Sequence, residues 1–312
     1  MRSFLNYEGI FEMKIGIIGL GDIAQKGYLP VLTEKENIEL ILCTRNIDTL
    51  KKLSKKYRIT QCVQTVDELI EKGIDAAFVS TATEAHFEIA EKLLENGINV
   101  YIDKPISLNF NESKKLVTLV EEKGLVAMVG FNRRFAPMIN KLKEYGKADI
   151  IIMQKNRFQF PDNTRRAIVE DFVHVVDTLR FLMDTEVKEL QVRYLEKDNL
   201  LHNVVIELIG EECTAIGIMN RNNGVTEEII EYMTAENKFV VENFIETTQF
   251  HNKNKIISKF GDWEPTLYKR GFYQIVDYFI SCVENNKTPV PSISDSLITH
   301  EICEKIVMMI TK

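Results

Sequence analysis

The sequence predicts an α/β fold: a doubly wound parallel sheet of the Rossmann type, followed by an α+β domain with a mostly antiparallel, open-faced sheet. Up to Gly130, short apolar runs alternate with amphipathic helical segments, which is typical of βαβ units. After Gly130, strand patterns follow one another with a single strong helix among them, which is typical of an antiparallel sheet. We expect an N-terminal extension over residues 1–12, a nucleotide-binding domain over 13–130 and a substrate and oligomerisation domain over 131–312.

The first domain divides into apolar runs of four to six residues and longer helical segments. Strands are predicted over residues 14–19, 38–43, 76–79, 99–102 and 125–129. Helices are predicted over residues 22–36, 49–57, 85–96 and 109–123. A further helix is expected at Thr65, because Glu68 follows it at the spacing of a capping box.

The second domain carries more strands than helices. Strands are predicted over residues 149–153, 189–194, 203–209, 215–219, 228–233 and 238–241. Helices are predicted over residues 166–182, 272–284 and 294–310. One face of such a sheet is expected to be open, and proteins seldom leave a large apolar face in water. We therefore expect a homodimer or homotetramer that associates through this sheet.

Charge and cysteine usage narrow the class of protein. A formal net charge of -7 argues against a broad nucleic-acid or anionic-membrane surface. No apolar run reaches the ~18 residues of a membrane span, and the first twelve residues lack the apolar core of a secretory signal. Five scattered cysteines without a C-x-x-C motif argue against structural zinc and a disulfide framework. We expect a cytoplasmic, metal-free protein that acts on a small molecule.

The segment Gly19-Leu20-Gly21-Asp22-Ile23-Ala24 matches the dinucleotide fingerprint G-x-G-x-x-G/A. Gly19 permits a tight turn after the first strand, Gly21 lets the backbone approach a pyrophosphate, and Ala24 keeps the helix close to the sheet. The helix start at Asp22 and Ile23 supplies unpaired N–H groups and a positive dipole end. Glycine turns also arise for packing alone, but the strand–turn–helix context favours a nucleotide site.

The end of the second strand bears on the choice between NAD and NADP. An acidic residue there would bind the ribose 2′-hydroxyl of NAD and repel a 2′-phosphate. The sequence instead has Thr44 and Arg45, a hydroxyl and a permanently charged fork suited to phosphate. NADP is therefore the expected cofactor, with NAD as the alternative. The competing interpretation is a solvated loop arginine.

Three further segments complete a family pattern. They are Ser80–His86, Asp103–Pro105 and Gly130–Phe135, and with Gly19–Ala24 they resemble the glucose–fructose oxidoreductase, inositol dehydrogenase and MocA (Gfo/Idh/MocA) family. A later helix, residues 170–177, resembles the MviM-like branch. The resemblance implies a Rossmann domain, an open-faced sheet domain that often forms the oligomer interface, and NAD(P)-dependent oxidation or reduction.

The resemblance also implies roles for particular residues. Lys104 of Asp103-Lys104-Pro105 would lie between nicotinamide and substrate, and the Lys–Pro bond of the family is often cis. Asp103 stands where the family has glutamate and, like Lys104, would lie at the cofactor. Three residues of the Ser80–His86 segment would lie near the cofactor: Thr81, Thr83 and His86. The alternatives are an ordinary strand-end lysine and, for His86, packing at the start of its helix.

The helix predicted over residues 166–182 carries a polar stripe. At ~100° per residue, Glu170, His174 and Asp177 fall near 0°, 40° and −20° on an otherwise largely apolar helix. Such a stripe must face a cleft or an internal network. A histidine there is suited to proton exchange near neutral pH, with Glu170 or Asp171 to orient it. A structural core histidine is the alternative.

These observations together predict an NADP-preferring oxidoreductase acting on a sugar, polyol or related small polar molecule. In oxidation His174 would accept the hydroxyl proton and Lys104 would polarise the substrate oxygen, while Glu170 or Asp171 would orient His174 or bind a further hydroxyl. Arg133 and Arg134 would hold a substrate oxyanion or a cofactor phosphate, or would brace the domain junction. The rival hypotheses are an NADP-sensing regulator that acts through a protein partner, and a reductase of an unsaturated or imine substrate.

Overall fold

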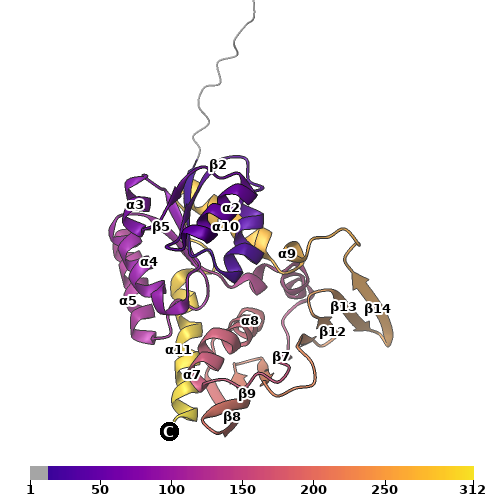
Figure 1. Cartoon of the computed structure of the whole chain (residues 1–312). Coiled ribbons are helices and arrows are strands. Elements are labelled where there is room, and N and C mark those ends of the chain that lie inside the picture. Colours follow the sequence, from indigo (N-terminus) through magenta and orange to yellow (C-terminus); the bar gives the residue numbers. More distant parts are fainter. Residues whose placement is uncertain (1–12) are drawn as a thin grey trace, which may run out of the picture. The chain divides into compact units, whose positions relative to one another are not determined.

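The computed structural model of the chain describes residues 13–312 (Figure 1). The extension expected over residues 1–12 lies outside the described residues. The chain forms two compact units that interleave along the sequence. The first unit comprises the residues up to Asp103 with Thr118–Met128 and Val276–Val290, and the second comprises Lys104–Val117, Val129–Ile275 and Pro291–Lys312. No helix among residues 13–312 is long and apolar enough to cross a membrane.

The first unit is built on a six-stranded parallel sheet with the strand order β3-β2-β1-β4-β5-β6. This is the doubly wound order of a dinucleotide-binding fold, as predicted. The strands are β1 (Met13–Ile18), β2 (Ile38–Cys43), β3 (Cys62–Val63), β4 (Ala76–Val79), β5 (Asn99–Ile102) and β6 (Ala127–Val129). The two-residue strand β3 was not predicted, because so short a run has no periodicity to recognise.

Helices flank this sheet, and several begin at recognisable capping residues. They are η1 (Ala24–Tyr28), α1 (Leu29–Leu32), α2 (Ile47–Tyr57), α3 (Val66–Glu71), η2 (Thr83–Ala85), α4 (His86–Glu95), α5 (Phe110–Lys123) and α10 (Phe272–Glu284). The predicted capping box of Thr65 and Glu68 is present at the start of α3. The helix predicted over residues 22–36 ends earlier, at Leu32, and contains the π-helical turn η1.

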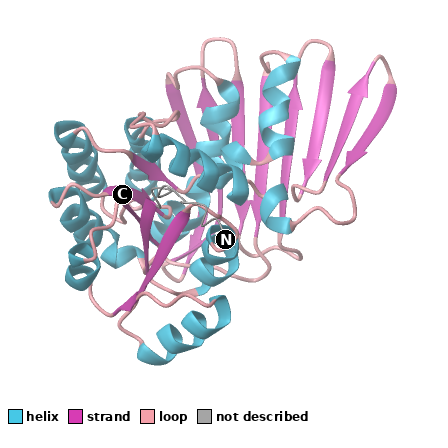
Figure 2. Ribbon diagram, turned by 90° about the horizontal axis from the view of Figure 1, so that it is seen from above, coloured by secondary structure: helices cyan, strands magenta, loops and turns pink. Residues whose placement is uncertain are grey.

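The second unit is built on an eight-stranded sheet with the order β14-β13-β12-β11-β7-β10-β9-β8 (Figure 2). The strands are β7 (Ile150–Asn156), β8 (Glu189–Lys197), β9 (Leu200–Ile209), β10 (Thr214–Asn220), β11 (Glu227–Met233), β12 (Asn237–Glu242), β13 (Glu246–His251) and β14 (Asn254–Lys259). Strands β7 and β10 run parallel, whereas the other paired strands run antiparallel. The prediction of a mostly antiparallel sheet is confirmed.

One face of this sheet is covered by the helix predicted over residues 166–182. The helix consists of α7 (Thr164–Arg166), the π-helical segment η5 (Ala167–Phe172) and α8 (Val173–Met183). It lies close to β10, since a Cβ placed on Gly217 would meet Val175 at 3.0 Å and Leu179 at 3.1 Å. The remaining helical elements are η3 (Asn132–Phe135), α6 (Pro137–Asn140), η4 (Lys141–Tyr145), α9 (Thr266–Lys269) and α11 (Ile293–Ile310).

The hairpin of β13 and β14 was not predicted from the sequence; Figure 1 shows it at one end of the sheet. Its strands lack the regular alternation of apolar and polar residues that marks a half-buried strand, and all of β14 is exposed. The turn residues Asn252 and Lys253 both have positive φ, 49° and 65°. Two-residue hairpin turns of type I′ require positive φ at both central residues. Asn252, a residue type that favours this conformation, is the sequence feature that indicates the turn.

Candidate active site

A cavity of about 880 Å³ lies in the first unit at the carboxyl ends of β1, β2 and β4. Parallel strands place ligand-binding loops at this edge of a doubly wound sheet. Seven of the residues predicted to bind cofactor line it: Gly19, Gly21, Asp22, Ile23, Thr44, Arg45 and Thr81. The cavity also has a side that was not predicted, formed by residues 64–67 at the start of α3. The capping box at Thr65 was the signal for that helix start.

The geometry around the two glycines fits a dinucleotide. Gly19 has φ +83°, and a Cβ there would lie 2.6 Å from the backbone of Thr81, so only glycine fits this turn. A Cβ on Gly21 would meet nothing within 4 Å, which leaves room beside the backbone for a pyrophosphate. Thr81 Oγ1 is buried without a hydrogen-bond partner among the described residues. A bound nucleotide would supply such a partner.

Other residues predicted to bind cofactor do not line this cavity. Ala24 is fully buried, where the fingerprint predicts close packing of the helix on the sheet. His86 is buried at the start of α4, and its Nε2 donates to the carbonyl of Thr81 at 3.2 Å. Thr83 begins η2, and Asp103 accepts a 2.5 Å hydrogen bond from the hydroxyl of Tyr28. These residues support the loops around the cavity.

The end of β2 has no acidic residue. Thr44 is half-buried and Arg45 is exposed, and both line the cavity. Two acidic residues elsewhere on the lining form ion pairs of their own: Asp22 lies 2.7 Å from Lys26, and Asp67 lies 2.5 Å from Lys92. Arg45 is thus the charged side chain that the end of β2 offers to a ligand in this cavity.

The second unit has a cavity of its own, about 520 Å³ in volume, in which polar side chains predominate. Three of the predicted site residues line it: Lys104, Glu170 and Asp171. The other lining residues are Arg157, Phe158, Phe160, Asp162, Arg166, Arg221 and Thr226. The lining residues come from four parts of the unit: the segment that follows β5, the loop after β7, the helical elements α7 and η5, and the loop between β10 and β11.

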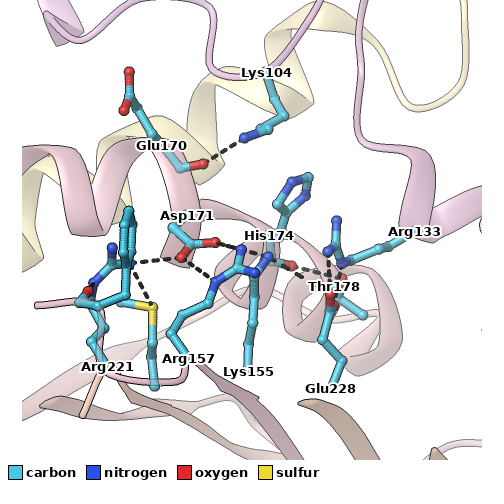
Figure 3. A network of polar contacts seen from close by, with 12 residues as sticks. Lys104, Arg133, Lys155, Arg157, Glu170, Asp171, His174, Thr178, Arg221 and Glu228 are labelled. Carbon is cyan, nitrogen blue, oxygen red and sulfur yellow. Dashed lines mark hydrogen bonds and ion pairs between the residues drawn. The ribbon is translucent and has the colours of Figure 1, made fainter. Parts of the chain in front are cut away.

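Lys104 reaches the helix that carries His174. The Lys104–Pro105 peptide bond is cis. The Nζ atom of Lys104 donates a 2.6 Å hydrogen bond to the backbone carbonyl of Glu170, within the π-helical segment η5 (Figure 3). π-Helical turns are frequent at functional sites because they interrupt the regular pairing of backbone groups. The next residue after the proline is also fixed, since the backbone N–H of Ile106 donates to His300 Nε2 at 2.9 Å.

His174 is buried and neutral. Only 6% of the residue is exposed, and Nδ1 has no hydrogen-bond partner in the described part of the chain. Burial, followed by the positive charges of Arg133, Lys104 and Lys155, holds the pKa of His174 well below its ordinary value of 6.5. The ring points to the side on which Lys104 lies (Figure 3). The imidazole is therefore in its neutral form, the form that can act as a base, although His174 itself is not among the residues that line the cavity.

Both carboxylates expected to orient His174, Asp171 and Glu170, are paired with cations. Asp171 binds Arg157 in a bidentate pair (2.8 and 2.6 Å), Lys155 Nζ at 2.9 Å and Arg221 Nη1 at 2.7 Å. Burial would raise the pKa of Asp171, but Lys155 and Arg157 outweigh it and hold the pKa well below its ordinary value. The carboxyl of Glu170 lies 3.2 Å from Arg166 Nε. Asp171 is therefore paired with arginine and lysine side chains. The charges that act on His174 are mainly positive, whereas a carboxylate neighbour was expected.

A second carboxylate, Glu228, closes the network on the other side. Arg133 donates to both of its oxygens at 2.7 Å, and Lys155 Nζ lies 3.8 Å away. Burial would raise the pKa of Glu228, but Arg133 and Lys155 lower it to about 2. Lys155 is 3% exposed, and burial lowers its pKa to about 8 against the pull of Glu228. Arg133, which was predicted to be a site residue, thus lies behind the cavity lining.

Sequence reasoning missed Lys155, Arg157, Arg221 and Glu228. One signal was available for Lys155: it is in phase with Ile151 and Met153, which face the buried side of β7. A lysine at a position that alternation assigns to the core indicates a paired internal charge. The partners themselves depend on sheet pairing, which places Glu228 opposite Lys155 in the register of β11 and β7.

Arg134 and Asp177 belong to a different network. The guanidinium of Arg134 bonds both oxygens of Asp177 at 2.8 and 2.5 Å, and it donates to Asp295 at 2.7 Å. Arg134 is 5% exposed and lines neither cavity. Of the roles expected for Arg134, the geometry favours bracing, because its donors are consumed by protein carboxylates. The predicted polar stripe therefore divides: Glu170 faces the cavity, whereas Asp177 faces α11.

Comparison with known proteins agrees with this geometry. Residues 13–131 match the GFO_IDH_MocA family, an oxidoreductase family with an NAD-binding Rossmann fold, and residues 137–252 match the YceM-like C-terminal domain. The oxidoreductase YceM of Salmonella typhimurium is 30% identical over 94% of this chain and 97% of its own length. The scyllo-inositol 2-dehydrogenase (NAD(+)) of Bacillus subtilis is 23% identical over 93% of this chain and 92% of its own.

Solved structures show the same fold over nearly the whole chain. The dehydrogenase MviM of Clostridium difficile superposes with a TM-score of 0.91 at 31% identity, covering 95% of this chain and 99% of that one. A Gfo/Idh/MocA family oxidoreductase of Vibrio cholerae gives 0.90 at 29% identity, covering 96% and 100%. The fingerprint, the two sheets and the matches over both parts of the chain agree. The chain belongs to the Gfo/Idh/MocA oxidoreductases with an NAD-binding Rossmann fold, in the MviM-like branch.

Proposed function

We propose that this protein transfers a hydride between NADP and a carbinol or carbonyl carbon of a sugar, a polyol or a related small polar molecule. The observation that carries the proposal is the pairing of a buried, neutral His174 with Lys104, whose ammonium lines the cavity of the second unit. A base and a cationic hydrogen-bond donor are the two groups that oxidation of an alcohol needs. The polyol named for the Bacillus subtilis relative supports the substrate class.

The chemistry divides between cofactor and protein. The nicotinamide supplies the hydride acceptor or donor. The side chain of His174 takes up the hydroxyl proton during oxidation and returns it during reduction. The ammonium of Lys104 donates to the substrate oxygen and stabilises the charge that develops there. Its hydrogen bond to the carbonyl of Glu170 limits the positions that this ammonium can take.

The cofactor would be held in the cavity of the first unit. Gly19 and Gly21 would accommodate the pyrophosphate, and Thr81 would offer its unpartnered hydroxyl. Arg45 and Thr44, in place of an acid at the end of β2, support NADP over NAD.

Two substitutions test the catalytic assignment. We expect Lys104→Met and His174→Asn to keep near-normal NADPH affinity, because the residues that would bind the dinucleotide lie in the other unit. Turnover should fall by at least ~100-fold in each, the lower end for losing one acid–base or electrostatic group. The double variant should lose less than the product of the two, because the residues act on one oxygen. Lys188→Met and His251→Asn change the same residue types at positions that line neither cavity, and they serve as controls.

The assay begins with a screen of aldoses, ketoses, polyols and dicarbonyls, monitored at the nicotinamide absorbance band. If His174→Asn turned over an accepted substrate at the wild-type rate, the proton path through His174 would be wrong. The regulator hypothesis is not favoured, since the named relatives are oxidoreductases and dehydrogenases. It would replace this proposal if NADPH bound tightly without any turnover and altered affinity for a protein partner.

A further inference from the structure

We propose that the substrate carries an anionic group, a carboxylate or a phosphate, which Arg157 binds in the cavity of the second unit. This inference deepens the proposed function and rests on it for the identity of the cavity as the substrate site. Three observations carry it: an excess of positive charge at the cavity, hydrogen-bond donors left over on two cationic side chains, and the placement of both side chains on the cavity lining.

The ion pairs around the cavity form one connected network (Figure 3). In the described part of the chain, it joins five cations to three carboxylates: Arg133, Lys155, Arg157, Arg221 and Arg270 with Asp162, Asp171 and Glu228. Lys104 adds a sixth cation, whose recorded hydrogen bond goes to a neutral backbone carbonyl. Arg166 and Glu170 pair with each other and cancel. The network and Lys104 together therefore carry three more positive than negative charges.

This excess is local, because the chain as a whole has a net charge of -7. Positive charge taken out of water without a partner is unfavourable, and Lys155 and Arg221 are almost fully buried, at 3% and 1% exposure. One carboxylate, Asp171, is shared by three cations. An anion entering the cavity would complete the pairing that the protein leaves unfinished.

The unused donors show where such an anion would bind. Arg157 gives Nε and one N–H of Nη2 to Asp171, so three of the five guanidinium N–H groups have no recorded acceptor among residues 13–312. The side chain is 33% exposed and lines the cavity. Lys104 gives one of its three ammonium N–H groups to Glu170. Arg221, by contrast, is consumed by Asp171, Asp162 and the carbonyl of Phe160.

The chemistry of these donors selects the ligand class. A guanidinium offers parallel N–H groups that match the two oxygens of a carboxylate or a phosphate, and such charge-assisted bonds are stronger than bonds to a neutral hydroxyl. A neutral polyol would leave the excess charge unpaired. Arg157 would thus anchor the anionic group, while Lys104 keeps a donor for the reacting oxygen.

Calorimetric titration of the full-length protein, with NADPH present, tests the inference without requiring turnover. The probes are matched in shape: D-glucose and D-sorbitol as neutral members, D-gluconate and D-glucuronate as carboxylates, and D-glucose 6-phosphate as the phosphate. We expect at least one anionic member to bind at least tenfold more tightly than its neutral counterpart. Its affinity should fall as sodium chloride is raised from 50 to 300 mM, because ion pairing is screened by salt. The carboxylate and phosphate arms distinguish the two kinds of anion.

Variants assign the effect to Arg157. We expect Arg157→Gln to weaken the anionic member by tenfold or more, and Arg157→Lys, which keeps the charge but loses the fork, to fall between Gln and wild type. Arg193→Gln, an exposed arginine on β8, should bind like wild type. Near-UV circular dichroism checks that each variant is folded. If a variant does not fold, the comparison of neutral with anionic probes in the wild-type protein still tests the inference.

Two results would overturn the inference: equal affinity for neutral and anionic members in wild type, or undiminished anion binding in folded Arg157→Gln. Failure of the proposed function is a separate outcome. Suppose that the anionic probes bind as expected while no compound of the substrate screen undergoes hydride transfer. That result would support the anion site and refute the oxidoreductase assignment of this cavity.

Discussion

His300 fixes the backbone next to Lys104 and makes the stability of the fold depend on pH. The residue lies on α11 and is 3% exposed. Its Nδ1 donates to the carbonyl of Ser296 at 2.8 Å, so Nε2 is the unprotonated nitrogen and accepts from the backbone N–H of Ile106 at 2.9 Å. Protonation of Nε2 would replace this acceptor with a second donor. The neutral ring is therefore required by the contacts it makes.

The size of the effect follows from the pKa. Burial lowers the pKa of His300 from 6.5 to about 4, against smaller opposing effects of Ser296 and Asp177. Because the pKa in the folded state is below that in the unfolded state, the unfolded chain takes up this proton first as the pH falls. The stabilisation is fully present above pH 6.5 and is lost as the pH falls to about 4. At about 1.4 kcal/mol per pKa unit, the loss is about 3 kcal/mol.

Urea unfolding between pH 7.5 and pH 4 measures this loss. We expect wild type to lose about 3 kcal/mol more than His300→Gln over the interval, because glutamine keeps an acceptor but does not titrate. At pH 7, His300→Leu should be destabilised by roughly 1–3 kcal/mol, the usual effect of leaving a buried N–H such as that of Ile106 without an acceptor. His174 and the buried carboxylates titrate in both proteins, so the difference isolates His300. Equal losses in wild type and His300→Gln would refute the reasoning.

Three further predictions concern the other parts of the molecule. Arg45→Ala should weaken NADPH by ten- to hundred-fold and NADH much less, as measured by fluorescence titration; equal losses, or tighter binding of NADH by wild type, would contradict NADP preference. Asp177→Asn should cost about 3–5 kcal/mol in urea unfolding, because it leaves buried Arg134 short of its main partner, and an unchanged midpoint would show that the pair is not structural. Light scattering should give a dimer or tetramer of the 36.0 kDa chain at micromolar concentration, and a clean monomer would contradict association through the open sheet.

Local patterns were sufficient to predict a parallel sheet followed by a mostly antiparallel one, although three strands, β3, β13 and β14, were missed. The parallel direction of the strands in the first unit follows from alternating apolar runs and helices, because parallel strands need crossover connections of this length. The turn at Gly19 was predictable because its positive φ excludes other residues. The hairpin of β13 and β14 was not predictable in this way, since β14 is fully exposed and β13 buries only Thr248, so no core imposes alternation on either strand.

The candidate site was predicted only in part, and the reason is physical. Periodicity placed Glu170 and His174 on one face of a buried helix, and the structure agrees. It gave no information on what would face them. Lys155 lies on β7, Arg157 directly follows that strand, and Glu228 lies on β11, and the pairing of these strands is encoded by no local pattern. The expected carboxylate partner of His174 came from considering its own helix alone. The charges that set the pKa of a buried group belong mainly to the elements packed against it.

Those charges determine which proton transfers the site can perform. A histidine with a depressed pKa is a weak base in isolation, yet the cations that lower its pKa would also lower that of a substrate hydroxyl held beside Lys104. Proton transfer from the hydroxyl to His174 is then less unfavourable than either pKa alone suggests, because the same field acts on both groups. An anionic group on Arg157 would weaken that field and raise the pKa of both groups together, while burial, the largest cause of the low pKa of His174, would remain. On this argument the anion would contribute to binding and orientation of the substrate, whereas the proton transfer itself would depend on the placing of the hydroxyl between Lys104 and His174.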